Sequence, residues 1–216
     1  LGPATIAPDI GWLGRIVDPV GRPLDGRPLM RGLVRRPMTG APPPAAERRP
    51  MGERLSTGVA VFDTLLPLVR GQRIGLFSGS GVGKSSLLAK FARGVAADVA
   101  VIALVGERGR ELRDFTERVL GRDGMARSVV VTSTSDQSPL MRRRCALSAM
   151  AVAEHFRDQG LHVLLLVDSV TRYAEAHREV ALASGESASL RGYPPSMAHS
   201  LMALAERAGP GVEGSG

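Results

Sequence analysis

Residues 78–85 read Ser-Gly-Ser-Gly-Val-Gly-Lys-Ser, directly after the apolar run 74–77 and before a stretch with helical periodicity. Small residues let consecutive backbone N–H groups surround a phosphate, while Lys84 neutralises its charge and Ser85 offers a hydroxyl to Mg²⁺. The stretch therefore predicts a P-loop between a strand and a helix, with a nucleoside triphosphate as its ligand.

The predicted phosphate-binding residues are the loop and the serine that follows it. They are Ser78, Gly79, Ser80, Gly81, Val82, Gly83, Lys84, Ser85 and Ser86. Ser78 stands where the pattern usually has glycine, and a small side chain still fits the end of a strand. The alternative is a glycine-rich turn that binds nothing; the strand–loop–helix context favours the phosphate site.

From about residue 54 the hydrophobic pattern alternates between strands and helices. We expect strands near 72–77, 98–105, 128–133 and 162–168, and helices over 83–95, 109–120, 139–159 and 171–183. Strands separated by helices of this length form a mostly parallel α/β sheet, in which ligands bind at the carboxyl ends of the strands.

The chain divides into three predicted parts. Residues 1–36 contain short strand-like pieces interrupted by Pro and Gly, and are interpreted as the tail of a β-rich unit whose upstream part is missing. Residues 37–53 form a stiff Pro-rich linker, and 54–216 form the α/β domain.

Composition limits the class of protein. The 216 residues carry a net charge of +7 and 44% hydrophobic residues, with no apolar run long enough to span a bilayer. The basic charge suits nucleic acid, acidic lipid or an acidic protein, but the aromatic residues that single-strand binders use are not interleaved with it, which argues against nucleic acid. The single Cys145 excludes an intramolecular disulfide and fits a reducing cytoplasm.

Two carboxylates follow predicted strands. Asp168 ends the run Leu-Leu-Leu-Val-Asp, a Walker B arrangement that would hold the Mg²⁺ shell beside Ser85, or alternatively cap the next helix. Glu107 follows the strand 98–105 and either activates water near a γ-phosphate or belongs to a solvated charge cluster with Arg108, Arg110 and Glu111.

Arginines near these strand ends have two interpretations. Arg108 and Arg172 each follow a carboxylate and either neutralise phosphate or lie on the surface at the start of a helix. The run Arg142-Arg143-Arg144 is interpreted as an exposed helical face or a subunit contact.

Several motifs together resemble the flagellar protein-export ATPases, type III secretion ATPases related to the catalytic subunits of rotary ATP synthases. They are Gly-Gln-Arg-Ile-Gly-Leu-Phe at 71–77, Val-Gly-Glu-Arg-Gly-Arg-Glu at 105–111, Thr-Ser-Asp-Gln-Ser-Pro-Leu-Met-Arg-Arg-Arg at 134–144, Leu-Leu-Leu-Val-Asp-Ser-Val-Thr-Arg-Tyr at 164–173 and Arg-Gly-Tyr-Pro-Pro-Ser at 191–196.

The resemblance covers essentially the whole chain and implies a RecA-like P-loop ATPase domain at 54–216, preceded at 1–36 by the remnant of an N-terminal β-barrel domain. It implies ATP and Mg²⁺ as cofactors, Glu107 as the catalytic glutamate, Arg108 and Arg172 near the phosphates, and Ser85 and Asp168 at the metal.

The resemblance also implies a cytoplasmic homo-oligomeric ring, a hexamer peripheral to the inner membrane, that delivers unfolded flagellar subunits and chaperone complexes to the export gate. An arginine finger, the aromatic adenine site and a helical domain would follow Gly216, so we expect residues 1–216 alone to be nearly inactive. The alternatives are an injectisome ATPase with the same chemistry, a RecA-like hexameric RNA translocase and a noncatalytic ring subunit.

Overall fold

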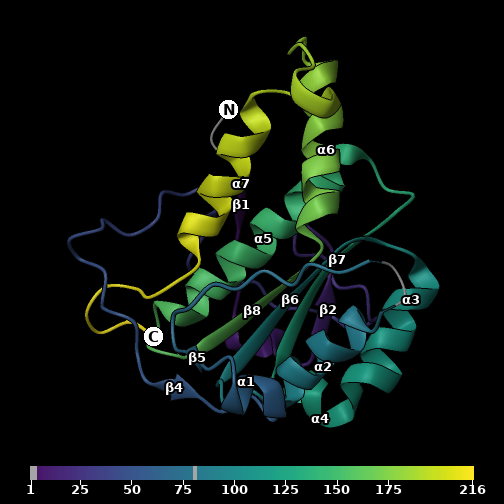
Figure 1. The fold of residues 1–216 in the computed structure, drawn as a ribbon. Helices are drawn as coiled ribbons and strands as arrows, with labels where there is room; N and C mark the ends of the chain where they lie inside the picture. The colour runs from purple at the N-terminus through teal and green to yellow at the C-terminus, as the bar shows by residue number, and fades with distance from the viewer. Residues whose placement is uncertain (1–3, 80–81) are drawn as a thin grey trace.

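The central element of the computed structural model, which describes residues 4–79 and 82–216, is a four-stranded parallel sheet in the order β2-β7-β6-β8 (Figure 1). Its strands are β2 (Arg15–Val17), β6 (Val99–Glu107), β7 (Ser128–Thr134) and β8 (Val163–Asp168). Two antiparallel pairs lie outside it: β1 (Thr5–Ile6) with β3 (Arg36–Pro37), and β4 (Arg54–Leu55) with β5 (Leu68–Val69). The predicted parallel α/β fold is confirmed.

Helices cover both faces of this sheet. They are α1 (Ala60–Thr64), α2 (Lys84–Gly94), α3 (Gly109–Asp114), α4 (Gly121–Ala126), α5 (Pro139–Arg157), α6 (Val170–Ala183) and α7 (Ser196–Arg207). Short 3₁₀ turns occur at η1 (Ile10–Trp12) and η3 (Leu190–Gly192), and the π-helix η2 (Phe115–Leu120) joins α3 to α4. Within the described part of the chain, no helix combines the length and apolar character that a membrane span requires.

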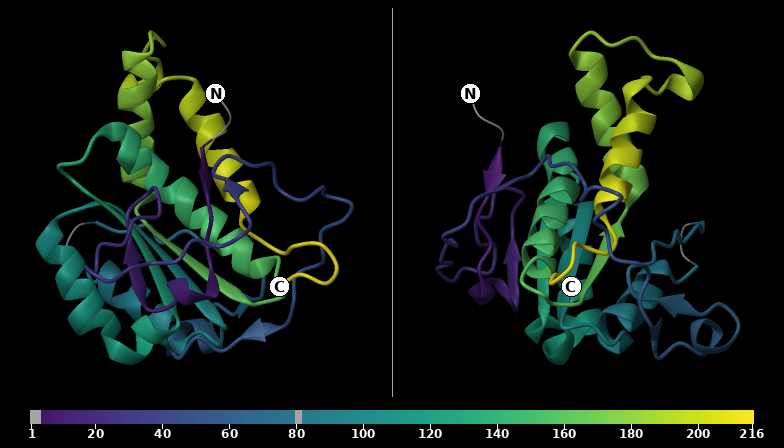
Figure 2. Two further views of the ribbon diagram at one scale, coloured as in Figure 1. Left: turned by 180° about the vertical axis from the view of Figure 1, so that it is seen from behind. Right: turned by 90° about the vertical axis from the view of Figure 1, so that its left-hand side faces the viewer.

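The period-two alternation of β6 creates the two halves of the core. Val101 and Ala103 face α5, together with Trp12 and Val17 of the N-terminal segment, which lies beside α5 (Figure 2). Ile102, between them, faces α2 on the opposite side of the sheet. Because both faces are covered, β6 is apolar almost throughout, as expected of a central parallel strand.

Residues 72–79 differ from the sequence prediction, because the strand expected near 72–77 is not formed. Arg73 is held instead at the end of α7, where its Nη1 lies 2.8 Å from both Ala205 O and Glu206 Oε1. Phe77 is 97% exposed. The segment therefore lies away from the sheet, and β8 remains at its edge.

The N-terminal segment contributes to the sheet. β2 pairs in parallel with β7, with Arg15 opposite Val129 and Val17 opposite Val131. Residues 1–36 were interpreted as part of a separate β-rich unit, and the origin of the segment in a β-barrel domain stays a prediction. Helix α7 was not anticipated; it packs along α5 and α6.

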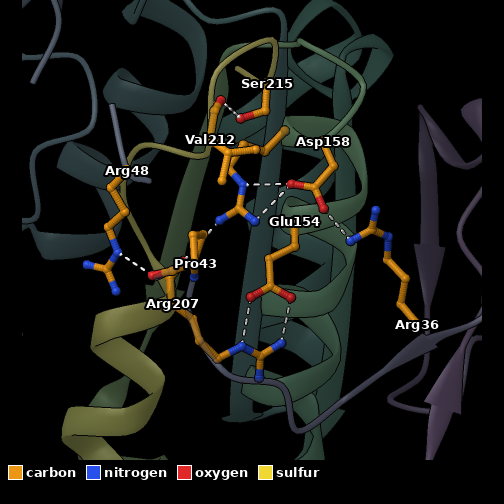
Figure 3. A network of polar contacts seen from close by, with 9 residues as sticks. Arg36, Pro43, Arg48, Glu154, Asp158, Arg207, Val212 and Ser215 are labelled. Carbon is orange, nitrogen blue, oxygen red and sulfur yellow. Dashed lines mark hydrogen bonds and ion pairs between the residues drawn. The ribbon is translucent and has the colours of Figure 1, made fainter. Parts of the chain in front are cut away.

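A network of arginine ion pairs fastens the Pro-rich stretch to α5 (Figure 3). Arg207 at the end of α7 is 3% exposed and makes two 2.7 Å contacts with the Glu154 carboxylate, and it donates to Met38 O at 2.6 Å. Nearby, Arg36 pairs with Asp158 at 2.7 Å. The network joins α7, α5 and the stretch after β3.

Replacing Arg207 with Met should lower the free energy of unfolding by about 3–5 kcal/mol, because the largely buried Glu154 carboxylate loses its counter-charge. Urea unfolding of the chain measures this difference. The matched control is Arg118→Gln, since Arg118 is exposed and pairs with Asp114 at 3.4 Å on the surface. Equal unfolding free energies for the two variants would contradict the importance of the buried pair.

Candidate functional site

The phosphate loop leads into α2, whose first residue is Lys84. Gly83 has φ +93°, a left-handed conformation that glycine adopts without strain, and it directs the chain into the helix. Leu88, Phe91 and Ala92 of α2 are buried against the sheet, which fixes the helix axis and its N-terminus. The partial positive charge of that end favours an anion.

Most of the predicted phosphate-binding residues are accessible. Ser78, Gly79, Val82, Ser85 and Ser86 are exposed, so their backbone and hydroxyl groups can meet a ligand. Ser80 and Gly81, also predicted to bind phosphate, lie outside the described residues. A hollow of about 830 Å³ adjoins the loop; its largely apolar wall includes Phe62, Leu65, Leu66 and Phe77, and it reaches Lys84.

Lys84 and Asp168 form an ion pair across the site. The Lys84 ammonium lies 2.7 Å from Asp168 Oδ1, with side-chain exposures of 34% and 7%. Asp168 is the last residue of β8, and Oδ1 has no aligned hydrogen-bond donor, so the charge of Lys84 compensates it. Ser169 caps α6 by accepting from Arg172 N at 3.3 Å, which leaves the Asp168 carboxylate for the site.

Glu107 ends β6 at an irregularity in the sheet. The β6–β7 register shifts between Val105 and Glu107, and Gly106 at φ +68° absorbs the shift. Burial, the hydrogen bond with Glu111 and the negative charge of Asp168 together raise the pKa of the Glu107 carboxyl to about 7, although the positive charge of Arg172 opposes the rise. A carboxyl with such a pKa can exchange a proton near neutral pH.

Arg172 lies beside Glu107. Its Nη2 is 3.5 Å from Glu107 Oε1, and its Nη1 donates a hydrogen bond to Gly106 O. Arg108, the other predicted arginine, is 65% exposed and lies 4.0 Å from Glu111. The structure thus brings together Lys84, Asp168, Glu107 and Arg172, and leaves Arg108 at the rim.

Glu111, which the sequence places in a charge cluster with Arg108 and Arg110, lies next to Glu107 in the structure. Its proximity to Glu107 lowers its own pKa while raising that of Glu107, so one proton is favoured on Glu107. Helical spacing does not predict this contact, because Glu107 ends β6 and only Glu111 lies in α3.

The oxygen donors of Asp168 and Ser85 fit a magnesium ion whose coordination shell is completed by a nucleotide. Asp168 Oδ1 is a buried carboxylate oxygen without an aligned donor, and the Ser85 hydroxyl is exposed at the start of α2. Across 4–79 and 82–216, no three His, Cys, Asp or Glu side chains gather closely enough to hold a metal ion. Mg²⁺ typically uses one or two carboxylates plus substrate phosphates and water, which agrees with this sparse set.

The chain is 52% identical over all of its 216 residues to the flagellum-specific ATP synthase of Agrobacterium fabrum and 51% identical to that of Salmonella typhimurium. It spans 46% of the length of each, that is, about half of the curated relatives it matches. The type 3 secretion system ATPase of Xanthomonas euvesicatoria is 49% identical over 94% of the chain and 46% of its own length.

Solved structures agree with the fold. A prototypical ATPase from the type III secretion system of pathogenic bacteria superposes with a TM-score of 0.91 at 44% identity, over 96% of this chain and 60% of that one. The assembled ATPase EscN of enteropathogenic E. coli, in complex with its central stalk EscO, superposes with a TM-score of 0.92 over 98% of this chain and 52% of that one.

The family model for the nucleotide-binding domain of the ATP synthase alpha/beta family matches residues 58–216. Its span coincides with nearly all of the predicted α/β domain at 54–216, including the phosphate loop and both carboxylate strand ends. The chain belongs to the ATP synthase alpha/beta family.

Proposed function

We propose that this chain is the nucleotide-binding part of an ATP hydrolase that energises type III export of flagellar proteins. The observation that carries the proposal is the meeting of Lys84, Asp168 and Glu107 at the carboxyl ends of β6 and β8. A phosphate-binding cation, a magnesium-type carboxylate and a carboxyl of near-neutral pKa are the groups that hydrolysis of a nucleoside triphosphate requires.

Each residue has a role in the proposed reaction. The loop amides of 78–86 and Lys84 bind the phosphates, and Ser85 and Asp168 hold the Mg²⁺ shell. When bound, the ion neutralises phosphate charge. Glu107 orients a water molecule and accepts its proton as the water oxygen bonds to the γ-phosphorus and the bond to the ADP oxygen breaks. Arg172 holds Glu107, and Arg108 adds positive charge at the rim.

Lys84 exchanges partners in this scheme. In the structure its ammonium lies 2.7 Å from Asp168 Oδ1 and neutralises that carboxylate. When MgATP binds, its phosphates supply a stronger anion for Lys84, and the magnesium shell supplies a cation for Asp168. Both side chains therefore still have a partner of opposite charge. Binding of MgATP can therefore replace the Lys84–Asp168 pair without leaving either charge unpaired.

The cellular role rests on the relatives. Flagellum-specific ATP synthases match over the whole chain, which favours flagellar export, with delivery of unfolded subunits at the cytoplasmic face of the inner membrane. The solved EscN structures are of an assembled ATPase, in one case with a central stalk, which favours assembly of this chain as well. Our proposal is a homo-oligomeric ring, a hexamer, that contacts export-apparatus, regulator and chaperone–substrate partners.

An injectisome ATPase is the second candidate, because the Xanthomonas type 3 secretion system ATPase is nearly as similar as the flagellar relatives. The two roles share the hydrolytic site and differ in cargo. Deleting the gene from its host separates them: loss of motility with normal effector secretion supports flagellar export, and the reverse result supports the injectisome.

Lys84→Ala in the full-length protein should weaken MgATP binding by at least about tenfold, because the β- and γ-phosphates lose their cation. Fluorescent-nucleotide titration measures the affinity. Lys90→Ala is the matched control, since Lys90 is the other lysine of the chain and is exposed on the same helix. Equal affinities for the two variants would remove Lys84 from the phosphate site.

Glu107→Gln should lower kcat of the full-length protein by about 10²–10⁴-fold while nucleotide binding is retained, because glutamine cannot accept the proton of water. Steady-state phosphate release measures turnover. Glu117→Gln, on the exposed face of η2, is the control for loss of one carboxylate. Unchanged turnover in Glu107→Gln would contradict the assignment of the base.

The turnover of the wild-type protein should rise with pH through about 7, because Glu107 holds a proton below its pKa and can act as a base only above it. Glu111→Gln should move this acidic limb to lower pH, since the loss of the neighbouring negative charge lowers the pKa of Glu107. A pH profile of kcat tests both statements. A limb that Glu111→Gln leaves in place would show that another group titrates there.

A further inference from the structure

Arg142, in the first turn of α5, is held by contacts within the chain. Its Nη2 lies 3.0 Å from both carboxylate oxygens of Glu179 on α6, and its Nε donates to Gln137 O at 3.2 Å. The side chain is only 18% exposed. Arg142 is therefore not on an exposed face, in contrast to the expectation for the run 142–144. Its side chain joins the start of α5 to α6.

The stem of Arg142 also lies against the backbone that carries Glu107. A Cβ atom built on Gly106 would be 3.3 Å from Arg142 Cδ and 3.5 Å from Arg172 Cδ. The two arginine stems thus both reach the side of Gly106 on which a side chain would project. Gly106 is the residue at which β6 leaves its regular register, so the stems limit the path of the chain into Glu107.

The same ion pair holds the helix that supplies Arg172. Arg172 and Glu179 are seven residues apart on α6, two turns along one face. Arg172 donates to Gly106 O and faces Glu107, while Glu179 receives Arg142. Arg142 therefore lies close to both sides of the Arg172–Glu107 pair: its stem lies beside Gly106 at the strand end, and its guanidinium pairs with Glu179 on the helix.

We propose that Arg142, through its ion pair with Glu179, is a positioning residue that keeps Arg172 and Glu107 aligned for water activation. The inference rests on the proposed hydrolytic function of Glu107. Arg142 itself touches no reacting atom; it acts by fixing the distance between β6 and α6 at the site.

The charge on Glu107 reports this alignment. Glu107 faces Arg172 of α6, Asp168 of β8 and Glu111 of α3, and Lys84 of α2 pairs with Asp168. Among these groups, Arg172 is the cation that lowers the pKa of Glu107. If α6 moves when the Arg142–Glu179 pair is broken, Arg172 shields Glu107 less and the pKa of Glu107 rises.

Arg142→Gln in the full-length protein should reduce kcat by about tenfold or more, since small displacements of a catalytic group have effects of this size. The acidic limb of the pH profile should move to higher pH, opposite to the shift expected for Glu111→Gln, and KM should change little. Arg144→Gln is the matched control: it removes the same charge from the same helix, and Arg144 has no ion pair within the described residues. Its kcat and pH profile should equal those of the wild type.

Glu179→Gln removes the ion pair from the α6 side and leaves Arg142 in place. This variant therefore tests the positioning role if Arg142→Gln does not fold. Because one interaction is removed in each case, the double variant should be no slower than either single variant. Fluorescent-nucleotide binding confirms that each variant is folded.

Wild-type kcat and pH profile in both Arg142→Gln and Glu179→Gln would overturn the positioning role. A loss of kcat without any shift of the acidic limb would also overturn it, because a general loss of structure does not act through Arg172. Glu107→Gln in the same assay distinguishes failure of the proposed role of Glu107 from failure of the positioning role. If that variant keeps full turnover, the proposed role of Glu107 as the base fails. If it is inactive while the Arg142 and Glu179 variants are normal, only the positioning role of Arg142 fails.

Discussion

The ion pair between Lys84 and Asp168 is the constraint on which the site depends. Asp168 is 6% exposed at the end of β8, and a buried carboxylate without a counter-charge is strongly destabilising. The Lys84 ammonium at 2.7 Å provides that charge and brings the first turn of α2 to the end of the sheet. The phosphate loop is therefore tied to the strand that carries the magnesium-type carboxylate.

The second constraint is the irregular end of β6. Residues 99–105 lie in the middle of the sheet, buried on both faces, and at Gly106, which has a positive φ, the register shifts so that Glu107 pairs with Thr134 of β7. Burial, together with the neighbouring Glu111 and Asp168, raises the pKa of Glu107 to about 7, and Arg172 limits the rise. A rigid strand thus ends in a carboxyl whose charge is set by neighbours from three elements.

The local hydrophobic pattern predicted most of the helices and strands of the α/β domain. The strands at β6, β7 and β8 and the helices α2, α5 and α6 lie where periodicity placed them, because each has a long apolar repeat of its own. The strand expected near 72–77 was wrong, since Arg73 binds at the end of α7, and no local signal reports so distant a partner. The addition of β2 to the sheet escaped prediction for the same reason: a three-residue strand is defined by its pairing with β7.

The sequence predicted which residues form the site better than it predicted the contacts between them. Lys84, Asp168 and Glu107 follow from motif and strand-end position, but the Lys84–Asp168 pair, the contact of Arg172 with Gly106 O and the anchoring of Arg142 by Glu179 depend on side chains that meet only in the folded chain. Their roles in catalysis remain our proposal. The most direct test is a structure of the full-length protein with Mg²⁺ and a non-hydrolysable ATP analogue. The account predicts that Lys84 leaves Asp168 for the phosphates while Asp168 turns to the magnesium shell; an intact Lys84–Asp168 pair, with nucleotide bound elsewhere, would contradict it.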